Sequence, residues 1–222
     1  MKVWVLIPAY NEAGGLTPLL EKVKAKGLPV LVVDDGSSDA TYEAACGLAD
    51  KVLRHEKNMG KGEALKDGLA CLSSDESVDY VVTMDADGQH SPDDLDLFLR
   101  EASRGKKFIV GNRMADPVGM PWLRVITNKF MSWLISRMTG QRIPDSQCGF
   151  RLLSRDVFSG IKIETGNFEV ESEMLVKAAA EKVPIDSVPI KSIYSIKARS
   201  KINPVIDTLR FIKFLICLKM VG

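Results

Sequence analysis

Two aspartates, Asp85 and Asp87, stand one residue apart directly after a short apolar run at residues 81–84. Successive side chains of an extended chain point to opposite sides, so two residues separated by one, here Ala86, share a side. Carboxylate oxygens in this arrangement suit Mg²⁺ or Mn²⁺, and such an ion also takes oxygens from a diphosphate. Two acids are also common in solvated turns, so the pair predicts a metal site only together with other motifs.

A second acidic pair, Asp34 and Asp35, follows the apolar residues 30–33. Carboxylates at the end of a strand accept hydrogen bonds from ribose hydroxyls or from the NH of a base. Residues 36–39 have the sequence Gly-Ser-Ser-Asp, which is also typical of a turn that caps a helix. We expect both features, with Asp35 binding a nucleoside and Asp39 capping the next helix.

Three further residues stand where a nucleotide contact is expected. Pro8 and Tyr10 suit an apolar wall for a nucleobase, although a turn with a packed tyrosine explains them equally well. Lys61 lies in the sequence Asn-Met-Gly-Lys-Gly at residues 58–62, which is either a nucleotide contact or the entry to a helix. That segment lacks the glycine spacing of nucleoside triphosphatases and of dinucleotide-binding proteins, so neither class is favoured.

The composition limits the partners and the compartment. The 222 residues include 30 Lys and Arg against 29 Asp and Glu, which gives a formal net charge of +1. No global attraction to nucleic acid is therefore expected. The cysteines lie too far apart for a zinc or redox motif, which is typical of a protein of the reduced cytosol; they are Cys46, Cys71, Cys148 and Cys217.

Neither end of the sequence predicts a membrane span. The apolar residues near the N-terminus are followed at once by a polar turn, which indicates a buried strand rather than a signal peptide. Residues 209–221 are apolar apart from Arg210, Lys213 and Lys219, but a bilayer core requires about 20 apolar residues. We predict a cytoplasmic protein that can lie peripherally on the inner face of the cell membrane, with an amphipathic helical appendage at residues 206–222.

Short β-branched runs alternate with helix-like segments through the first half of the chain. Strands are predicted at residues 3–7, 30–33, 81–84 and 108–110, and helices at residues 15–26, 40–49, 61–72 and 92–103. Pro92 after Ser91 is typical of the first position of a helix. The alternation predicts an α/β fold with a mostly parallel central sheet flanked by helices. Ligands of such sheets bind beyond the carboxyl ends of the strands, where both acidic pairs lie.

The regular alternation ends after Met114. Helices are predicted at residues 122–138 and 169–181, and strands at residues 150–153 and 188–193. The first of these helices is rich in Trp, Phe, Met and Ile and carries three basic residues, which fits either a membrane interface or a helix packed on the sheet. No linker is visible, so residues 1–205 are predicted to form one domain.

Six motifs follow one another within residues 1–205. They are Pro8-Ala-Tyr-Asn-Glu12, Asp34-Asp-Gly-Ser-Ser-Asp39, Asn58-Met-Gly-Lys-Gly62, Asp85-Ala-Asp-Gly-Gln-His90, Gly111-Asn-Arg113 and Asp145-Ser-Gln-Cys-Gly-Phe-Arg151. In this order they resemble the family 2 glycosyltransferases, and most of all the branch of dolichyl- and polyprenyl-phosphate mannosyltransferases. The resemblance implies a GT-A fold that binds a nucleotide-diphosphate sugar, a divalent ion (Mg²⁺ or Mn²⁺), and inversion at the anomeric carbon.

The resemblance also assigns roles to single residues. The positions for the nucleotide sugar are Pro8, Tyr10, Glu12, Asp35, Lys61, Asp85, Ala86, Asp87, Gln89 and Lys201, of which Asp85, Asp87 and Gln89 match the metal positions. Arg113 matches a basic residue that faces both the transferred sugar and the acceptor phosphate, and Arg124 and Asn128 match further acceptor ligands. Arg199 stands where the family more often has glycine or glutamate before its late Ser-Lys.

The chemistry of the acceptor decides which groups the site requires. A phosphate is already ionised at neutral pH and requires cations, which Arg113 and Arg124 would supply as planar, bidentate partners. A sugar hydroxyl requires a base instead, and Asp145 is the first candidate and Glu173 the second. The catalytic residues predicted for the two routes together are Asp87, Arg113 and Asp145.

Three functions follow from these residues. The favoured prediction is transfer of a hexose from a UDP- or GDP-sugar to a lipid acceptor of the polyprenyl-phosphate type. The alternative is transfer to a hydroxyl of a glycan, with Asp145 as the base. A further alternative is a nucleotide-sugar-binding protein without turnover.

Overall fold

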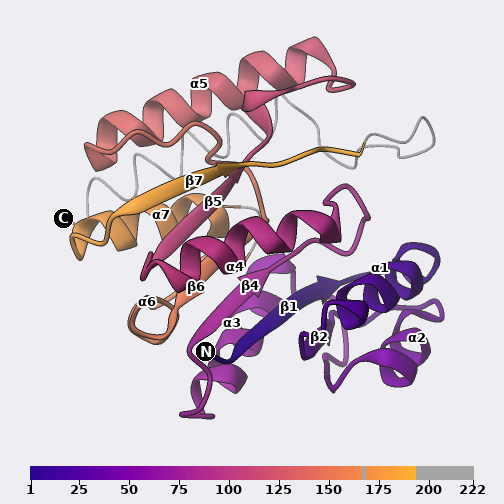
Figure 1. Cartoon of the computed structure of the whole chain (residues 1–222). Coiled ribbons are helices and arrows are strands. Elements are labelled where there is room, and N and C mark those ends of the chain that lie inside the picture. Colours follow the sequence, from indigo (N-terminus) through magenta and orange to yellow (C-terminus); the bar gives the residue numbers. More distant parts are fainter. Residues whose placement is uncertain (167–168, 194–222) are drawn as a thin grey trace.

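The computed structural model describes residues 1–166 and 169–193 of the chain. Within them, seven strands form one sheet in the order β3-β2-β1-β4-β6-β5-β7 (Figure 1). The elements are β1 (Val3–Ala9), α1 (Ala13–Ala25), β2 (Val30–Asp34), α2 (Thr41–Leu48), β3 (Lys51–Arg54), α3 (Lys61–Ser73), β4 (Tyr80–Thr83), η1 (Pro92–Asp94), α4 (Leu95–Ser103), β5 (Phe108–Asn112), η2 (Arg113–Ala115), α5 (Trp122–Thr139), β6 (Arg151–Ser154), α6 (Arg155–Gly160), α7 (Val170–Ala180) and β7 (Ile185–Pro189). The predicted appendage at residues 206–222 and the predicted domain limit at residue 205 lie outside the described residues.

The parallel strands β1, β2 and β4 form the centre of the sheet. Ile7 of β1 is paired with Val32 of β2, and Val5 of β1 is paired with Val82 of β4. Every residue of β2 is buried, because helices cover the sheet on both faces. Strands buried on both faces are apolar at consecutive positions, and these apolar runs allowed the strands to be predicted from the sequence. The predicted mostly parallel α/β sheet is therefore confirmed, as are its four predicted N-terminal strands.

β6 runs antiparallel to both of its neighbours, β4 and β5. Its first residue, Arg151, is consequently paired with Thr83 and Val110, near the carboxyl ends of those two strands. This direction brings the turn at residues 145–150, which precedes β6, to the edge of the sheet where β4 and β5 end. The chain thereby adds a further loop to the edge at which ligands of such sheets bind.

The edge strands differ from the prediction. The bounds of the strand predicted at residues 188–193 are wrong, because β7 begins three residues earlier and occupies Ile185–Pro189. β7 is an edge strand in which Ile185 and Val188 are buried and Ser187 is exposed, so it contains no continuous apolar run. β3 at the opposite edge was not predicted for the same reason, since its residues are half-buried or exposed. The short helix α6 was not predicted either.

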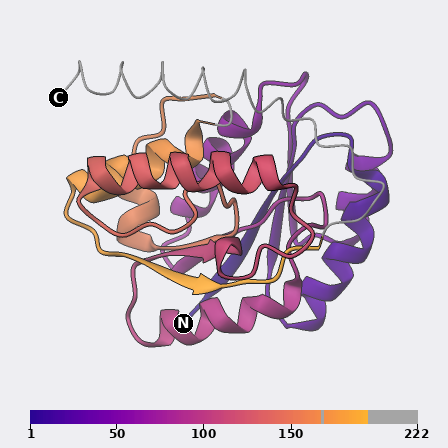
Figure 2. The ribbon, with the colours of Figure 1, turned by 90° about the horizontal axis from the view of Figure 1, so that it is seen from above.

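Helices lie on both faces of the sheet (Figure 2). α1 and α4 share one face, where Lys26 Nζ lies 2.6 Å from Asp96 Oδ2. α3 and α6 share the other face, where the hydroxyl groups of Ser73 and Ser159 lie 2.8 Å apart. α5, which confirms the helix predicted at residues 122–138, lies along one border of the molecule beside β5 and β7 (Figure 1). Among the described residues, no helix is both long enough and apolar enough to span a bilayer.

Candidate active site

The loops that follow β1 and β2 are joined by hydrogen bonds. Asn11, whose φ is 52°, accepts a hydrogen bond at its side-chain oxygen from the Ser38 amide at 2.9 Å. In return, the Asn11 amide donates to Ser37 Oγ at 3.0 Å. The loop that contains Pro8, Tyr10 and Glu12 is therefore fixed against the loop that contains Asp35, as the predicted nucleotide site requires.

Asp39 has a different local role from the predicted one. The N-cap position of α2 is held by Ala40, one residue later than expected. Asp39 Oδ1 still accepts a hydrogen bond from the Thr41 amide at 3.0 Å, and its Oδ2 accepts one from the Ala13 amide at 3.3 Å. Asp39 therefore links the starts of α1 and α2 from just outside the helix.

Asp35 is buried and holds the loop that leads into α3. Its Oδ1 accepts hydrogen bonds from His55 Nδ1 at 2.7 Å and from the Met59 amide at 2.8 Å. Its Oδ2 accepts a hydrogen bond from the Gly60 amide at 2.8 Å. A nucleoside contact of Asp35 stays a prediction, and it would add to a carboxylate that already accepts three hydrogen bonds.

A hollow of about 370 Å³ opens beside Asp35, at the carboxyl ends of β2 and β3. Its lining consists of Gly36, Ser37, Arg54, His55 and Glu56. This is the edge of the sheet at which α/β folds bind nucleotides. Tyr10, which is 40% exposed, lies in the neighbouring loop, so an aromatic surface is available near the hollow.

Lys61 bridges two carboxylates at the centre of the site. Its Nζ lies 2.6 Å from Asp85 Oδ1 and 2.5 Å from Glu171 Oε1. Burial alone would lower the pKa of Lys61, but the charges of Asp85 and Glu171 raise this pKa above its usual value. Burial would likewise raise the pKa of Asp85, yet Lys61 holds that pKa below its usual range. Lys61 and Asp85 are therefore both ionised at neutral pH.

Asp87 lies within electrostatic reach of Asp85. Burial and the negative charge of Asp85 raise the pKa of Asp87, although its carboxylate accepts a hydrogen bond from the Gln89 amide at 3.0 Å. Two adjacent carboxylates with excess negative charge fit a hard divalent ion. Residues 1–166 and 169–193 contain no group of three or more His, Cys, Asp or Glu side chains that would hold a metal without further ligands. Mg²⁺ or Mn²⁺ would therefore need oxygens from water or from a bound diphosphate in addition to Asp85 and Asp87.

The turn before β6 packs directly against Asp85. Thr83 Oγ1 donates a hydrogen bond to the Gly149 carbonyl at 2.7 Å. A Cβ atom on Gly149 would lie 2.7 Å from each carboxylate oxygen of Asp85, closer than side chains tolerate. Only glycine at position 149 lets Asp85 keep its place beside Lys61. This explains the glycine in the motif at residues 145–151.

Arg113 and Asp145 form a buried, bidentate ion pair. Arg113 Nε lies 2.7 Å from Asp145 Oδ2, and Arg113 Nη2 lies 2.9 Å from Asp145 Oδ1. The Arg113 amide also donates to Asp145 Oδ2 at 3.1 Å. Arg113 is 5% exposed and Asp145 is fully buried. The charge of Arg113 contributes to the low pKa of Asp85, so the pair lies close to the predicted metal ligands.

Glu173, the second candidate base, is also engaged by the protein. Its carboxylate accepts hydrogen bonds from the Glu164 amide at 2.8 Å and from the Thr165 amide at 2.9 Å. Lys177 Nζ lies 2.7 Å from the same carboxylate. Although burial opposes it, hydrogen bonds from Lys177 and Thr165 lower the pKa of Glu173. Glu173 thus secures the segment before α7.

The predicted acceptor ligands lie on α5. Asn128 is 6% exposed, and its side-chain nitrogen has no hydrogen-bond partner among the described residues. Arg124 lies one turn earlier on the same side of the helix and is half-buried. Lys201, the predicted late diphosphate ligand, lies outside the described residues.

Arg151 has a structural role that the sequence did not reveal. This side chain is 1% exposed and donates to the carbonyl groups of Cys148 and Ser146, both at 2.8 Å, and of Glu171 at 2.5 Å. It therefore fixes the turn at residues 145–150 to the start of α7. In the sequence, the only sign of this role was that Arg151, a charged residue, directly precedes the apolar residues of the strand.

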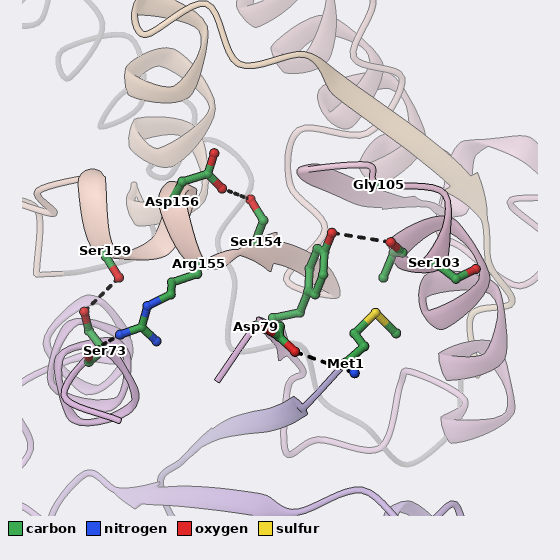
Figure 3. A pocket seen from close by; sticks show the side chains of 11 residues that line it. Met1, Ser73, Asp79, Ser103, Gly105, Ser154, Arg155, Asp156 and Ser159 are labelled. Carbon is green, nitrogen blue, oxygen red and sulfur yellow. Dashed lines mark hydrogen bonds and ion pairs between the residues drawn. The ribbon is translucent and has the colours of Figure 1, made fainter. Parts of the chain in front are cut away.

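A larger hollow, of about 960 Å³, lies at the opposite end of the sheet. Figure 3 shows the side chains that line it. Met1 and Tyr80 at the amino ends of β1 and β4 contribute to it, together with Ser154 at the end of the antiparallel β6. Its most prominent cation, Arg155, already donates hydrogen bonds to the carbonyl groups of Ser73, Asp75 and Val78. We assign no function to this hollow, because none of the predicted site residues lies in it.

Solved structures of other proteins share this fold. The glucosyl-3-phosphoglycerate synthase of Mycobacterium tuberculosis, crystallised with Mn²⁺, uridine diphosphate and glucosyl-3-phosphoglycerate, matches with a TM-score of 0.70. The match covers 94% of this chain and 74% of that chain at 20% identity. The mannosyl-3-phosphoglycerate synthase of Rubrobacter xylanophilus matches with a TM-score of 0.71 over 95% of this chain and 72% of that chain, also at 20% identity. The predicted GT-A glycosyltransferase fold is confirmed.

The sequence profile of Glycosyl transferase family 2 matches residues 4–161, and the chain belongs to this family. An uncharacterised protein of Methanocaldococcus jannaschii is 32% identical over 99% of this chain and 93% of its own length. The UDP-N-acetylglucosamine–dolichyl-phosphate N-acetylglucosaminyltransferase of Methanococcus voltae is 28% identical over 98% of this chain and 96% of its own length. The dolichol-phosphate mannosyltransferase of Pyrococcus furiosus is 30% identical over 90% of this chain, which spans 58% of that enzyme.

Proposed function

We propose that the chain is an inverting, metal-dependent hexosyltransferase that moves a sugar from a UDP- or GDP-linked donor to the phosphate of a polyprenyl-type lipid. Relatives that act on dolichyl phosphate support this acceptor. Asp85 and Asp87 would hold Mg²⁺ or Mn²⁺, with Gln89 in the same loop. The ion would neutralise the charge that develops on the departing nucleotide diphosphate.

The pairing of Asp145 with Arg113 is the observation that carries the choice of acceptor. Transfer to a hydroxyl requires a base that can take up its proton. Asp145 is fully buried and each of its oxygens accepts a hydrogen bond from Arg113, while Glu173 is engaged by Thr165 and its neighbours. Transfer to a phosphate requires no base, because the acceptor oxygen is already negative.

Arg113 has the chemistry that a phosphate acceptor needs. Asp145 fixes the plane of its guanidinium group, so the cation does not have to be ordered again when an anion arrives. We therefore infer that Asp145 positions Arg113, and that Arg113 faces the acceptor phosphate. Asn128 contributes a buried donor on the neighbouring helix α5.

An exposed apolar face on α5 supports an acceptor that is carried by a membrane. Trp122, Ile126, Phe130 and Trp133 are exposed and recur every three or four residues, so they share one side of the helix. The whole of α5 contains three basic residues and no acidic one. Tryptophan and basic side chains are typical of helices that lie in the headgroup region of a membrane.

The charge of α5 favours an anionic membrane over a second copy of the chain as the partner of this face. A second copy of the helix would bring Lys129 and Arg137 towards like charges. Residues 209–221 of the same chain are also basic, with Arg210, Lys213 and Lys219 and no acidic residue. We therefore infer that the apolar face of α5 rests on the inner face of the cell membrane. The predicted acceptor ligands Arg124 and Asn128 would then be turned towards the domain.

A transfer assay with matched acceptors tests the proposal. The full chain would be incubated with Mn²⁺, radiolabelled UDP- or GDP-hexoses, and either undecaprenyl phosphate or undecaprenol in detergent. We expect label in the organic phase with the phosphate only. Transfer to the alcohol or to a soluble saccharide, without transfer to the phosphate, would instead establish the hydroxyl route. Donor binding without transfer to any acceptor would indicate a binding protein.

A further inference from the structure

The contact between Lys61 and Glu171 joins two elements that lie far apart in the chain. Lys61 is the first residue of α3, and Glu171 lies in the first turn of α7. Their charged atoms are 2.5 Å apart, and the same ammonium group is 2.6 Å from Asp85. No motif of the sequence assigns a role to Glu171.

The position of Lys61 is unfavourable without these two carboxylates. The start of a helix carries a partial positive charge, which disfavours a cation in the first turn. Lys61 is nevertheless held there, with a side chain that is only 19% exposed. Asp85 and Glu171 therefore provide the negative charge that keeps this ammonium group in place.

Glu171 is buried in a way that requires a positive partner. Its side chain is 7% exposed, and its Oε2 has no hydrogen-bond partner among the described residues. Burial of an unpaired carboxylate is costly, and the ammonium group of Lys61 provides the pairing. Arg151 lies near but donates its hydrogen bond to the main-chain carbonyl of Glu171, not to the carboxylate.

We propose that Glu171 is a positioning residue that shares the ammonium group of Lys61 with Asp85, and that Lys61 is a built-in counter-cation of the metal site. This inference rests on the proposed metal role of Asp85 and Asp87. Lys61 and a divalent ion compete for Asp85, so the ion has to displace part of an existing ion pair. Glu171 then retains the ammonium group, which stays beside the incoming diphosphate rather than being expelled to solvent.

Binding of Mn²⁺ alone, without donor, measures this competition directly. The free-ion signal in electron paramagnetic resonance would give the Mn²⁺ affinity of the wild type, Lys61→Met, Glu171→Gln and the double variant. We expect Lys61→Met to tighten Mn²⁺ binding by about tenfold, which is within the range of coupling between contacting charges. Glu171→Gln is expected to weaken binding several-fold, because Lys61 is then left with Asp85 alone.

The double variant separates positioning from a direct charge effect. If Glu171 acts through Lys61, Glu171→Gln has no effect on Mn²⁺ affinity once Lys61→Met is present. The exposed pair of Lys66 and Glu63, whose charged atoms are 3.0 Å apart on the same helix, provides matched control variants, Lys66→Met and Glu63→Gln. Neither control is expected to change the affinity. Lys61→Gln is a second variant that removes the charge but keeps a side-chain hydrogen-bond donor.

Three results would overturn the inference. If Lys61→Met and Lys61→Gln leave Mn²⁺ affinity unchanged, Lys61 does not compete for the site. An equal loss of affinity from Glu171→Gln with and without Lys61 would mean that Glu171 acts through its own charge. If neither the wild type nor any variant binds Mn²⁺, the proposed metal site fails as well. If the Lys61 and Glu171 variants bind Mn²⁺ like the wild type, but replacement of Asp87 abolishes binding, only this inference fails and the proposed function stands.

Discussion

Replacement of Asp145 by Asn would test whether this residue positions Arg113 or removes a proton. Asn has nearly the same size as Asp but only one acceptor oxygen, and its NH₂ group would face an N–H of the guanidinium. Asp145 accepts two hydrogen bonds from the Arg113 side chain, at 2.7 and 2.9 Å. In the variant one of them is lost, because an N–H of Arg113 then faces an N–H of Asn. The variant also leaves the charge of Arg113 without its buried partner.

The size of the effect follows from the burial of the pair. Breaking a buried ion pair by removing one partner costs about 3–5 kcal/mol of folding free energy. Asn keeps one hydrogen bond to Arg113, so we expect the lower end, about 3 kcal/mol. In a domain of this size 1 kcal/mol lowers the melting temperature by about 2–4 °C, so the expected decrease is about 6–12 °C.

Thermal unfolding followed by circular dichroism would measure this decrease, and the transfer assay would measure turnover. Asp96→Asn is the matched control, because Asp96 pairs with Lys26 at 2.6 Å but is 65% exposed. We expect no resolvable change of melting temperature in the control. Loss of turnover in Asp145→Asn at an unchanged melting temperature would refute the positioning role and make Asp145 the base for a hydroxyl acceptor.

Three other changes test separate parts of the site. Gly149→Ala would place a Cβ 2.7 Å from both carboxylate oxygens of Asp85, so we expect weaker binding of Mn²⁺ with UDP in calorimetry. Burial raises the pKa of Cys148 to about 12, so we expect iodoacetamide at pH 8 to leave it unmodified in the folded protein, as measured by mass spectrometry of its peptides. Trp133 is 57% exposed on α5, and Trp133→Ala is expected to reduce co-sedimentation with anionic vesicles by about tenfold or more, because a large apolar contact is lost.

Each of these predictions has its own contrary result. Gly160→Ala is the control for Gly149→Ala, since its Cβ would meet no atom within 4 Å, and an equal loss in both variants would contradict the steric argument. Alkylation of Cys148 as fast as that of the exposed Cys46 would contradict its burial. Equal sedimentation of the Trp133 variant and the wild type with phosphatidylserine vesicles would exclude this face from membrane binding.

The edge of the sheet that carries the site was predictable from the chain alone. Asp35, Asp85 and Arg113 each follow a buried apolar strand, and the carboxyl ends of parallel strands meet at one edge. Their proximity therefore follows from the alternation of strands and helices, without knowledge of any long-range contact. The helix at residues 122–138 was predictable for a similar reason, since its apolar spacing is local.

The pairings within the site were not predictable in this way. Glu171 in the first turn of α7 reaches Lys61 at the start of α3 from far along the chain, and no local pattern specifies that contact. Asp145 and Arg113 were predicted separately for two different acceptors, yet they form one ion pair. Their pairing depends on the antiparallel direction of β6, which the four residues of that strand do not encode by themselves.

The described contacts divide the site into a part that is already fixed and a part that a ligand has to change. Asn11 joins the first two loops, Asp35 holds the entry to α3, and Arg151 fixes the turn before β6. These bonds involve backbone groups, so the loops are ordered during folding and need not be ordered again on binding. The ion pair of Lys61 with Asp85 is different, because it uses an oxygen that a divalent ion would need. Donor binding should therefore exchange charged partners at Asp85 while the surrounding loops keep their positions.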